Sequence, residues 1–388
     1  MSVGLPVPVV GSVGFAMLLA ACGGGGDSAT GPSQPAGSLT VGSCTIVEGA
    51  PTCPATVSWT TTNATSPRVL LGSTTLATTA TGSTTLPIGA GTQAVTLLDG
   101  ATQLDSKSVI GTCVSASAWD GTVCRVFAIR TVERAPTPFV ESGRAVTLEV
   151  VIYKPQGPGP HPAVIFNHGS TGNGDDPSQF RITYTNEAIA RFFADRGWLV
   201  AFPQRRGRGA SDGLYDEGFT PDRSRYSCLA APALAGFERA LLDVDAAAAY
   251  LATRGDVDAT RMLSAGTSRG GVLAVVHAAE RPDLFDGAVN FVGGWLGEGC
   301  QDSVAVNRPT FARGGTFPGA TIWLYGDNDT FYSLAHSRAN FDAFIAAGGT
   351  GSFHIRTRAQ SLNGHFIVND PTLWTDDLDT FVRSVGGG

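Results

Sequence analysis

The chain has 388 residues, a length that favours two domains over one. Hydrophobic residues make up 43% of it and charged residues only 15%, which excludes a mainly disordered protein and leaves room for a large core. The net charge is −7 and no basic run is longer than Arg205-Arg206, so we do not expect nucleic acid as a partner.

The first 21 residues have the features of an export signal. Residues 5–21 are apolar, too short a stretch for a typical membrane span and long enough for the core of a signal peptide. They end in Leu19-Ala20-Ala21-Cys22, which resembles the bacterial lipoprotein signal, although no Lys or Arg precedes it. We predict a lipoprotein-type signal peptide over 1–21 and lipidation of Cys22, with a transmembrane anchor as the alternative.

Two segments of different composition follow. Residues 22–37 are rich in Gly, Ser and Pro and are predicted to form a flexible tether. Residues 38–114 contain short alternating runs of Val, Leu, Ser and Thr separated by turn residues, which predicts a small β-sandwich of the immunoglobulin-like kind. Because it shows no set of catalytic side chains, we expect a spacer or a module that binds a surface or polymer. Residues 115–145 are predicted to be a bridge with some strand content.

Strands and helices alternate over the remaining residues, 146–388. The alternation predicts an α/β fold with a doubly wound, mostly parallel sheet and helices on both faces. The expected strands are 146–153, 163–167, 198–202, 261–265, 287–292, 320–325 and 352–357, and the expected helices are 186–196, 236–252, 271–279 and 333–347.

A strand and a helix flank Gly266-Thr267-Ser268-Arg269-Gly270, which has the pattern G-x-S-x-G. In this context the pattern is typical of a nucleophile elbow, a strained turn that lifts the serine hydroxyl clear of the sheet. A side chain at either glycine would collide with the neighbouring strand or helix. The sequence therefore predicts Ser268 as a catalytic nucleophile.

A serine nucleophile needs a base, and the base needs an acid that orients it. In this type of fold the acid precedes the histidine along the chain. Strand 320–325 is followed by two candidate acids, Asp327 and Asp329, and the last strand is followed by a glycine-bearing loop with His365. We predict a triad of Ser268, His365 and one of these aspartates.

These segments together resemble the α/β-hydrolase superfamily, and within it the dienelactone-hydrolase-like group, over about 146–385. The resemblance also rests on Phe166-Asn167-His168-Gly169-Ser170 and on residues 193–203 and 205–213. The true dienelactone hydrolases have a cysteine nucleophile where this chain has Ser268. The resemblance therefore implies hydrolysis of carboxylic esters in general, and we expect no cofactor and no metal.

The resemblance also assigns roles around the nucleophile. The usual spacing after the strand-end glycine favours Asp329 as the acid and leaves Asp327 to cap the turn. The backbone N–H groups of Ser170 and Arg269 take the place of the oxyanion hole, with a simple glycine turn at Ser170 as the alternative. Trp295 is expected either to line the substrate pocket or to pack in the core.

We also make predictions for three arginines and for the cysteines. Arg205, Arg206 and Arg208 are expected to brace their loop against acidic residues rather than to bind an anionic substrate. Apart from Cys22 there are six cysteines, and their proximity in the sequence suggests one of fifteen possible pairings, although reduced thiols are the alternative. The predicted disulfides are Cys44–Cys53, Cys113–Cys124 and Cys228–Cys300.

The sequence thus predicts an exported serine esterase of the carboxylesterase type, which acts on a small-molecule or polymeric ester through an acyl-enzyme. It would be anchored by lipid at the bacterial envelope, in the outer membrane or at the cell surface, or be secreted, and would contact the membrane only through that lipid. The alternatives are a serine peptidase that resembles the prolyl-oligopeptidase group and a non-catalytic, anchored surface-binding protein.

Overall fold

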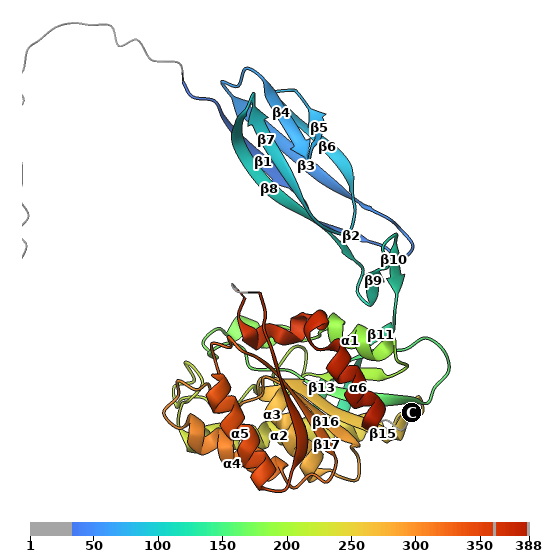
Figure 1. Cartoon of the computed structure of the whole chain (residues 1–388), viewed down its shortest axis with the longest axis vertical. Helices are drawn as coiled ribbons and strands as arrows, with labels where there is room; N and C mark the ends of the chain where they lie inside the picture. The colour runs from blue at the N-terminus through green and yellow to red at the C-terminus, as the bar shows by residue number, and fades with distance from the viewer. Residues whose placement is uncertain (1–32, 360–361, 386–388) are drawn as a thin grey trace, which may run out of the picture. The chain divides into compact units, whose positions relative to one another are not determined.

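The computed structural model of the chain describes residues 33–359 and 362–385, and every structural statement below concerns these residues (Figure 1). The predicted signal peptide, Cys22 and most of the predicted tether lie outside them. The described residues form two compact units. One comprises residues 33–42, Thr56–Thr85 and Gln93–Val109, and the other comprises Ser43–Ala55, Leu86–Thr92 and the chain from Ile110 onward.

The segment up to residue 113 is all-β, as predicted. One sheet has the strand order β1-β3-β6 and another has the order β2-β8-β7-β4-β5. In β3 the side chains of Cys53, Ala55, Val57 and Trp59 are buried and the residues between them are more exposed, so a period of two buries one face. The strands are β1 (Ala36–Val41), β2 (Cys44–Ile46), β3 (Cys53–Thr62), β4 (Pro67–Leu71), β5 (Thr74–Ala77), β6 (Thr81–Ile88), β7 (Gly91–Asp99) and β8 (Thr102–Cys113).

Two disulfides of the second unit close short loops, and both pairings predicted from the sequence are confirmed. Cys44 is bonded to Cys53, and Cys113 is bonded to Cys124. These cysteines pack around Ile46 in a small apolar cluster. Cys124 begins β10 (Cys124–Val126), which pairs antiparallel with β9 (Ser117–Trp119).

The predicted mostly parallel sheet is confirmed in the second unit. Its eight strands have the order β11-β12-β14-β13-β15-β16-β17-β18; β12 pairs antiparallel with β11 and β14, and every other pairing is parallel. The strands are β11 (Ile129–Glu141), β12 (Arg144–Lys154), β13 (His161–Asn167), β14 (Leu199–Pro203), β15 (Val257–Thr267), β16 (Gly287–Phe291), β17 (Ala320–Gly326) and β18 (Thr350–Arg356). The segment predicted as a bridge therefore supplies the edge strand β11.

Helices cover both faces of this sheet. In β13, Val164 and Phe166 enter one core cluster while Ala163 and Ile165 enter another, because neighbouring side chains of a strand point to opposite faces. The helices are α1 (Glu187–Ala194), α2 (Ala230–Ala252), α3 (Arg269–Glu280), α4 (Ser303–Gly314), α5 (Leu334–Ala346) and α6 (Thr375–Val385), with 3₁₀ turns η1 (Pro177–Arg181), η2 (Gly364–Asn369) and η3 (Pro371–Leu373). Within the described ranges, no helix combines the length and apolarity that a membrane span requires.

Candidate active site

The residues predicted to carry the chemistry all follow the carboxyl ends of parallel strands. Ser170 follows β13, Ser268 follows β15, Trp295 follows β16, Asp329 follows β17, and His365 follows β18. Parallel strands of one sheet end at the same edge, where open α/β sheets bind their ligands. The topology therefore brings these five residues to one edge of the sheet.

Ser268 sits on the strained turn that the sequence predicts. Its φ of +56° lies in the left-handed region, which side-chain-bearing residues rarely adopt. A Cβ at Gly266 would lie 2.2 Å from the carbonyl oxygen of Gly270, and a Cβ at Gly270 would lie 2.0 Å from that of Asn167. Both positions thus exclude any side chain, and the turn is held by a 2.9 Å hydrogen bond from the Ser268 amide to the Phe291 carbonyl.

His365 has a carboxylate partner. Its Nδ1 lies 2.8 Å from Oδ2 of Asp329, and the side chains of both residues are buried. The other oxygen of Asp329 accepts the backbone N–H groups of Phe331 and Tyr332 at 2.7 and 3.0 Å. Asp327 instead accepts the Thr357 hydroxyl at 2.5 Å in an exposed position. Of the two candidate acids, Asp329 is the one that meets the histidine.

The loops that carry Asp329 and His365 approach each other closely. A Cβ at Gly326 would lie 2.4 Å from the Gly364 carbonyl oxygen, so only glycine permits this approach. Asn363 joins the loops, because its Oδ1 accepts the His365 amide at 2.9 Å and its Nδ2 donates to the Thr330 hydroxyl at 2.7 Å. The backbone thereby fixes the histidine next to its acid.

Tyr332 is a residue of this site that sequence reasoning missed. Its ring lies 5.6 Å from the His365 ring, and it lines the same pocket as Ser268. Burial raises the pKa of Tyr332 well above that of an exposed tyrosine, so the hydroxyl stays protonated. Tyr332 thus lies beside both His365 and the pocket that Ser268 lines. Its one signal in the sequence is its place three residues after Asp329.

The two amides predicted for the oxyanion hole lie beside the serine. Arg269 is the first residue of α3, where a backbone N–H has no partner within the helix. Ser170 follows Gly169, and a Cβ on that glycine would lie 3.0 Å from Cβ of Ser268. Ser170, Ser268 and Arg269 line one pocket. Both residues thus lie next to the candidate nucleophile.

The pocket has a volume of about 570 Å³ and combines aromatic walls with a polar rim. Its aromatic and aliphatic lining comes from Tyr226, Leu229, Trp295, Leu296, Phe331 and Tyr332. Trp295 fits both expectations for it, because it lines the pocket and is also a buried core side chain whose indole N–H donates to the Ala233 carbonyl at 2.7 Å.

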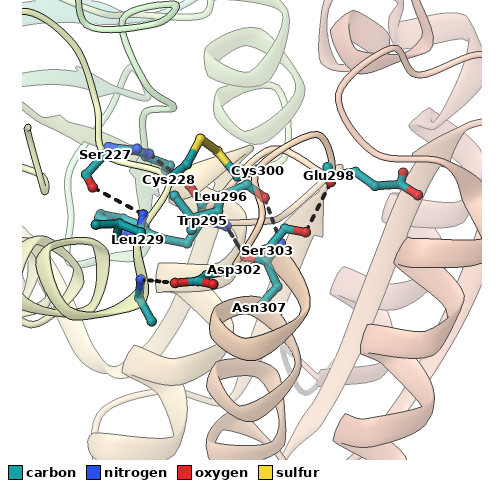
Figure 2. The surroundings of a disulfide bond; sticks show 12 residues. Ser227, Cys228, Leu229, Trp295, Leu296, Glu298, Cys300, Asp302, Ser303 and Asn307 are labelled. Atoms are coloured by element: carbon teal, nitrogen blue, oxygen red, sulfur yellow. Dashed lines mark hydrogen bonds between the residues drawn. A yellow bond between two sulfur atoms is a disulfide. The ribbon is translucent and has the colours of Figure 1, made fainter.

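A disulfide between Cys228 and Cys300 borders this pocket, and the pairing predicted from the sequence is confirmed (Figure 2). It joins the segment before α2 to the loop after β16. The same two segments are connected by a 2.8 Å hydrogen bond from the Ala230 amide to Asp302. Asn307 holds the loop from below by accepting the amides of Trp295 and Leu296 at 2.9 and 3.0 Å (Figure 2).

The arginines after β14 brace their loop, as expected. The Arg205 guanidinium donates to Glu217 at 2.5 Å and that of Arg206 donates to Asp243 at 2.6 Å, and all four side chains are buried. Arg208 donates to the Gln179 carbonyl at 2.7 Å. Asp212, the nearest acid in the sequence, accepts instead from Thr147 and Arg134.

A known protein family matches most of the α/β part of the chain. Residues 148–355 match the dienelactone hydrolase family, while no curated protein sequence matches the chain. Similar solved structures include Est1E of Butyrivibrio proteoclasticus with ferulic acid bound (16% identity, TM-score 0.46, covering 63% of this chain and 96% of that one). Another is the Pyrococcus furiosus esterase Pf2001 (14% identity, TM-score 0.45, covering 67% of this chain and 92% of that one). A third is a putative dienelactone hydrolase of Klebsiella pneumoniae (19% identity, TM-score 0.41, covering 66% of this chain and 98% of that one). Because the family match spans more than half of the 388 residues, the chain belongs to the dienelactone hydrolase family.

Proposed function

We propose that the protein is a serine esterase that hydrolyses carboxylic esters with Ser268, His365 and Asp329 as its catalytic triad. The observation that carries the proposal is the strained Ser268 turn at the same sheet edge as the 2.8 Å His365–Asp329 pair. Membership of a hydrolase family and the pocket beside Ser268 support it.

The reaction follows from the roles of these groups. The Ser268 oxygen attacks the ester carbonyl carbon while Nε2 of His365 takes the hydroxyl proton, and Asp329 stabilises the imidazolium through Nδ1. The amides of Ser170 and Arg269 bind the resulting oxyanion. The alcohol leaves with the proton from His365, and an acyl-enzyme forms. Water, deprotonated by His365, then attacks the acyl carbon, and the acid and the free serine are released.

The location of the enzyme is part of the proposal. Three disulfides point to an oxidising, extracytoplasmic compartment. We infer export through the signal at 1–21 and a lipid anchor on Cys22, at the bacterial envelope. The all-β segment would then be an immunoglobulin-like spacer that separates the catalytic unit from the anchor, and the substrate would be a small or polymeric ester.

The test is hydrolysis of p-nitrophenyl esters of increasing acyl length beside a matched peptide p-nitroanilide. We expect ester turnover by the wild type, no turnover of the anilide, and loss of ester turnover in Ser268→Ala with an unchanged circular dichroism spectrum. Turnover of the anilide alone would favour a peptidase, and ester turnover that survives in Ser268→Ala would reject the nucleophile.

A further inference from the structure

Glu217 has a buried carboxylate near the candidate oxyanion hole, and this carboxylate has no role in the reaction described above. It comes from the irregular segment between β14 and α2. Its side chain is 3% exposed and accepts hydrogen bonds from two arginines, Arg205 at 2.5 Å and Arg269 at 3.2 Å. Each arginine is also connected to one of the two residues whose amides are proposed to bind the oxyanion. Arg205 bonds the loop that carries Ser170, and Arg269 is itself the second of these residues.

The first connection runs through Arg205. While its Nε binds Glu217, its Nη1 donates to the His168 carbonyl at 2.9 Å and its Nη2 donates to the Gly169 carbonyl at 3.3 Å. The planar guanidinium thus holds the carboxylate and two consecutive carbonyls at once, in a rigid fork that a single lysine ammonium lacks. Arg205 therefore fixes the backbone of the loop that carries Ser170.

His168, which belongs to the same loop, also helps to fix it. Nε2 of His168 accepts the Arg205 backbone N–H at 3.3 Å, so the proton of the neutral ring is on Nδ1, which lies 2.8 Å from the Gly169 carbonyl. Burial, together with the nearby Arg205 and Arg208, lowers the pKa of His168 well below its usual value and keeps the ring neutral. The Gly169 carbonyl therefore accepts two hydrogen bonds, one from His168 and one from Arg205.

The direction of that carbonyl determines the direction of the Ser170 amide. A trans peptide is planar, with its C=O and N–H pointing in opposite directions. The Ser170 N–H therefore points away from the two groups that donate to the Gly169 carbonyl, His168 and Arg205, and Ser170 itself lines the pocket.

The second connection runs through Arg269. Its Nη1 donates to both the side chain and the backbone carbonyl of Glu217, and its Nε donates to the Trp295 carbonyl at 3.1 Å. Its guanidinium also lies 3.8 Å from the Tyr226 ring and 4.5 Å from the Trp295 ring. The residue whose amide begins α3 is thus fixed by its own side chain to the same carboxylate.

We propose that Glu217 is a positioning residue that aligns both oxyanion donors, holding the Ser170 amide through Arg205 and the Arg269 amide through the Arg269 side chain. The inference rests on the proposed esterase function. It links Arg205 and Arg269 through one residue, because removal of the Glu217 carboxylate leaves both buried guanidinium groups without their counterion.

The ionisation of Glu217 fits this role. Burial raises the pKa of Glu217, but Arg205 and Arg269 together outweigh burial, so the pKa lies below the usual value. The carboxylate is therefore charged at neutral pH. It can accept from both guanidinium groups, whereas a neutral amide of the same shape would offer one acceptor and one misplaced donor.

The test compares Glu217→Gln with Asp243→Asn. Asp243 is an equally buried carboxylate paired with the neighbouring Arg206, but it has no contact with the Ser170 loop. Each enzyme is assayed on an ester and on the matching thionoester, whose carbonyl sulfur accepts hydrogen bonds poorly. An aligned oxyanion hole prefers the oxygen substrate, so the ratio of the two kcat/KM values reports the alignment of the donors.

We expect Glu217→Gln to lower kcat on the oxygen ester by about 10- to 100-fold, somewhat less than the ~10²–10³-fold loss of a whole donor. KM should change little and the preference for oxygen should fall several-fold. Asp243→Asn should keep the wild-type preference even where its thermal stability drops. Arg205→Lys, which keeps the charge beside Glu217 but not the fork on the two carbonyls, should lower the preference as well.

Each outcome decides between possibilities. A wild type that is inactive on both substrates would reject the proposed function itself. An active wild type with an unchanged oxygen preference in Glu217→Gln or Arg205→Lys would overturn only the positioning role. An equal loss of preference in Asp243→Asn, or failure of both test variants to fold, would also overturn it, because Glu217 would then serve stability alone.

Discussion

At the scale of single residues, Asp329 uses both of its carboxylate oxygens, one on His365 and the other on two backbone amides. Asp329→Asn would replace one acceptor by an NH₂ group and favour the wrong tautomer of His365. In a well-studied triad this change costs about 10⁴-fold in kcat, and we expect a loss of similar size here. Steady-state kinetics on a p-nitrophenyl ester would measure it.

Asp327→Asn is the matched control, because Asp327 is exposed and its side chain bonds only Thr357 among the described residues. We expect less than a threefold effect from the loss of one surface hydrogen bond. If the two variants ranked in the opposite order, the role of the acid would pass to Asp327.

The hydroxyl of Tyr332 is the second group whose effect can be isolated. Tyr332→Phe keeps the ring beside His365 and removes only the hydroxyl, which we expect to bond the Ser268 side chain in the pocket that both residues line. One such bond contributes about 0.5–1.5 kcal/mol, so we expect kcat to fall by up to about tenfold. Tyr250→Phe, which removes a hydroxyl bonded to Glu133, is the control and should leave kcat unchanged. A rise in kcat for Tyr332→Phe would mean that this hydroxyl holds Ser268 away from His365.

The residues of the site differ in how far the sequence predicts them. The elbow is recognisable because Gly266 and Gly270 are needed by the local backbone and lie two residues from Ser268. Tyr332 and Glu217 carry no such pattern. Their partners are distant along the chain, and a carboxylate in a polar, irregular segment looks the same in sequence whether it is exposed or holds two buried arginines.

At the scale of elements, the strands of the parallel sheet are predicted best, because burial on both faces makes them continuous apolar runs. The edge strand β11 was missed as part of the catalytic sheet, since Ala135 is its only buried residue. Helix α4 was missed as well: it contains Pro309, which breaks the usual helical pattern. Helix α6 was also not predicted.

The Cys228–Cys300 disulfide fastens two elements that border the pocket. The cysteines are 72 residues apart, so the chain-entropy estimate for the bond is on the order of 4 kcal/mol. We expect Cys228→Ser to lower the melting temperature by roughly 10 °C. We also expect it to broaden acyl selectivity, because the disulfide would no longer hold together the two segments that carry Leu229 and Trp295 of the pocket wall. Scanning calorimetry and rates on esters of different acyl length would measure the two effects.

Two further variants test the assignment of that effect to the pocket. Cys228→Ser combined with Cys300→Ser should be no worse than either alone, since each loses the same bond. Cys113→Ser, which opens a disulfide that does not line the pocket, should lower stability and leave selectivity as it is. Broadened selectivity in Cys113→Ser would show that general loosening, not the pocket disulfide, is responsible.

At the scale of the whole molecule, the predicted lipid anchor decides where the enzyme works. Cys22→Ser removes the only thiol that the lipoprotein-type signal offers for acylation. We expect the wild type to enter the detergent phase on Triton X-114 partitioning and the variant to remain in the aqueous phase or unprocessed. Equal partitioning of the two proteins would reject the anchor while leaving the esterase proposal intact.

The positive φ of Ser268 has a consequence for the stability of the folded protein as a whole. A non-glycine residue in such a conformation costs about 1–3 kcal/mol, so the proposed nucleophile would lower the stability of the fold in exchange for turnover. Ser268→Gly should therefore raise the melting temperature by a few degrees while abolishing activity, because glycine adopts this φ without penalty. Ser268→Ala keeps the Cβ and should abolish activity without raising the melting temperature. Calorimetry of the two inactive variants side by side would measure how much the turn at residue 268 destabilises the fold.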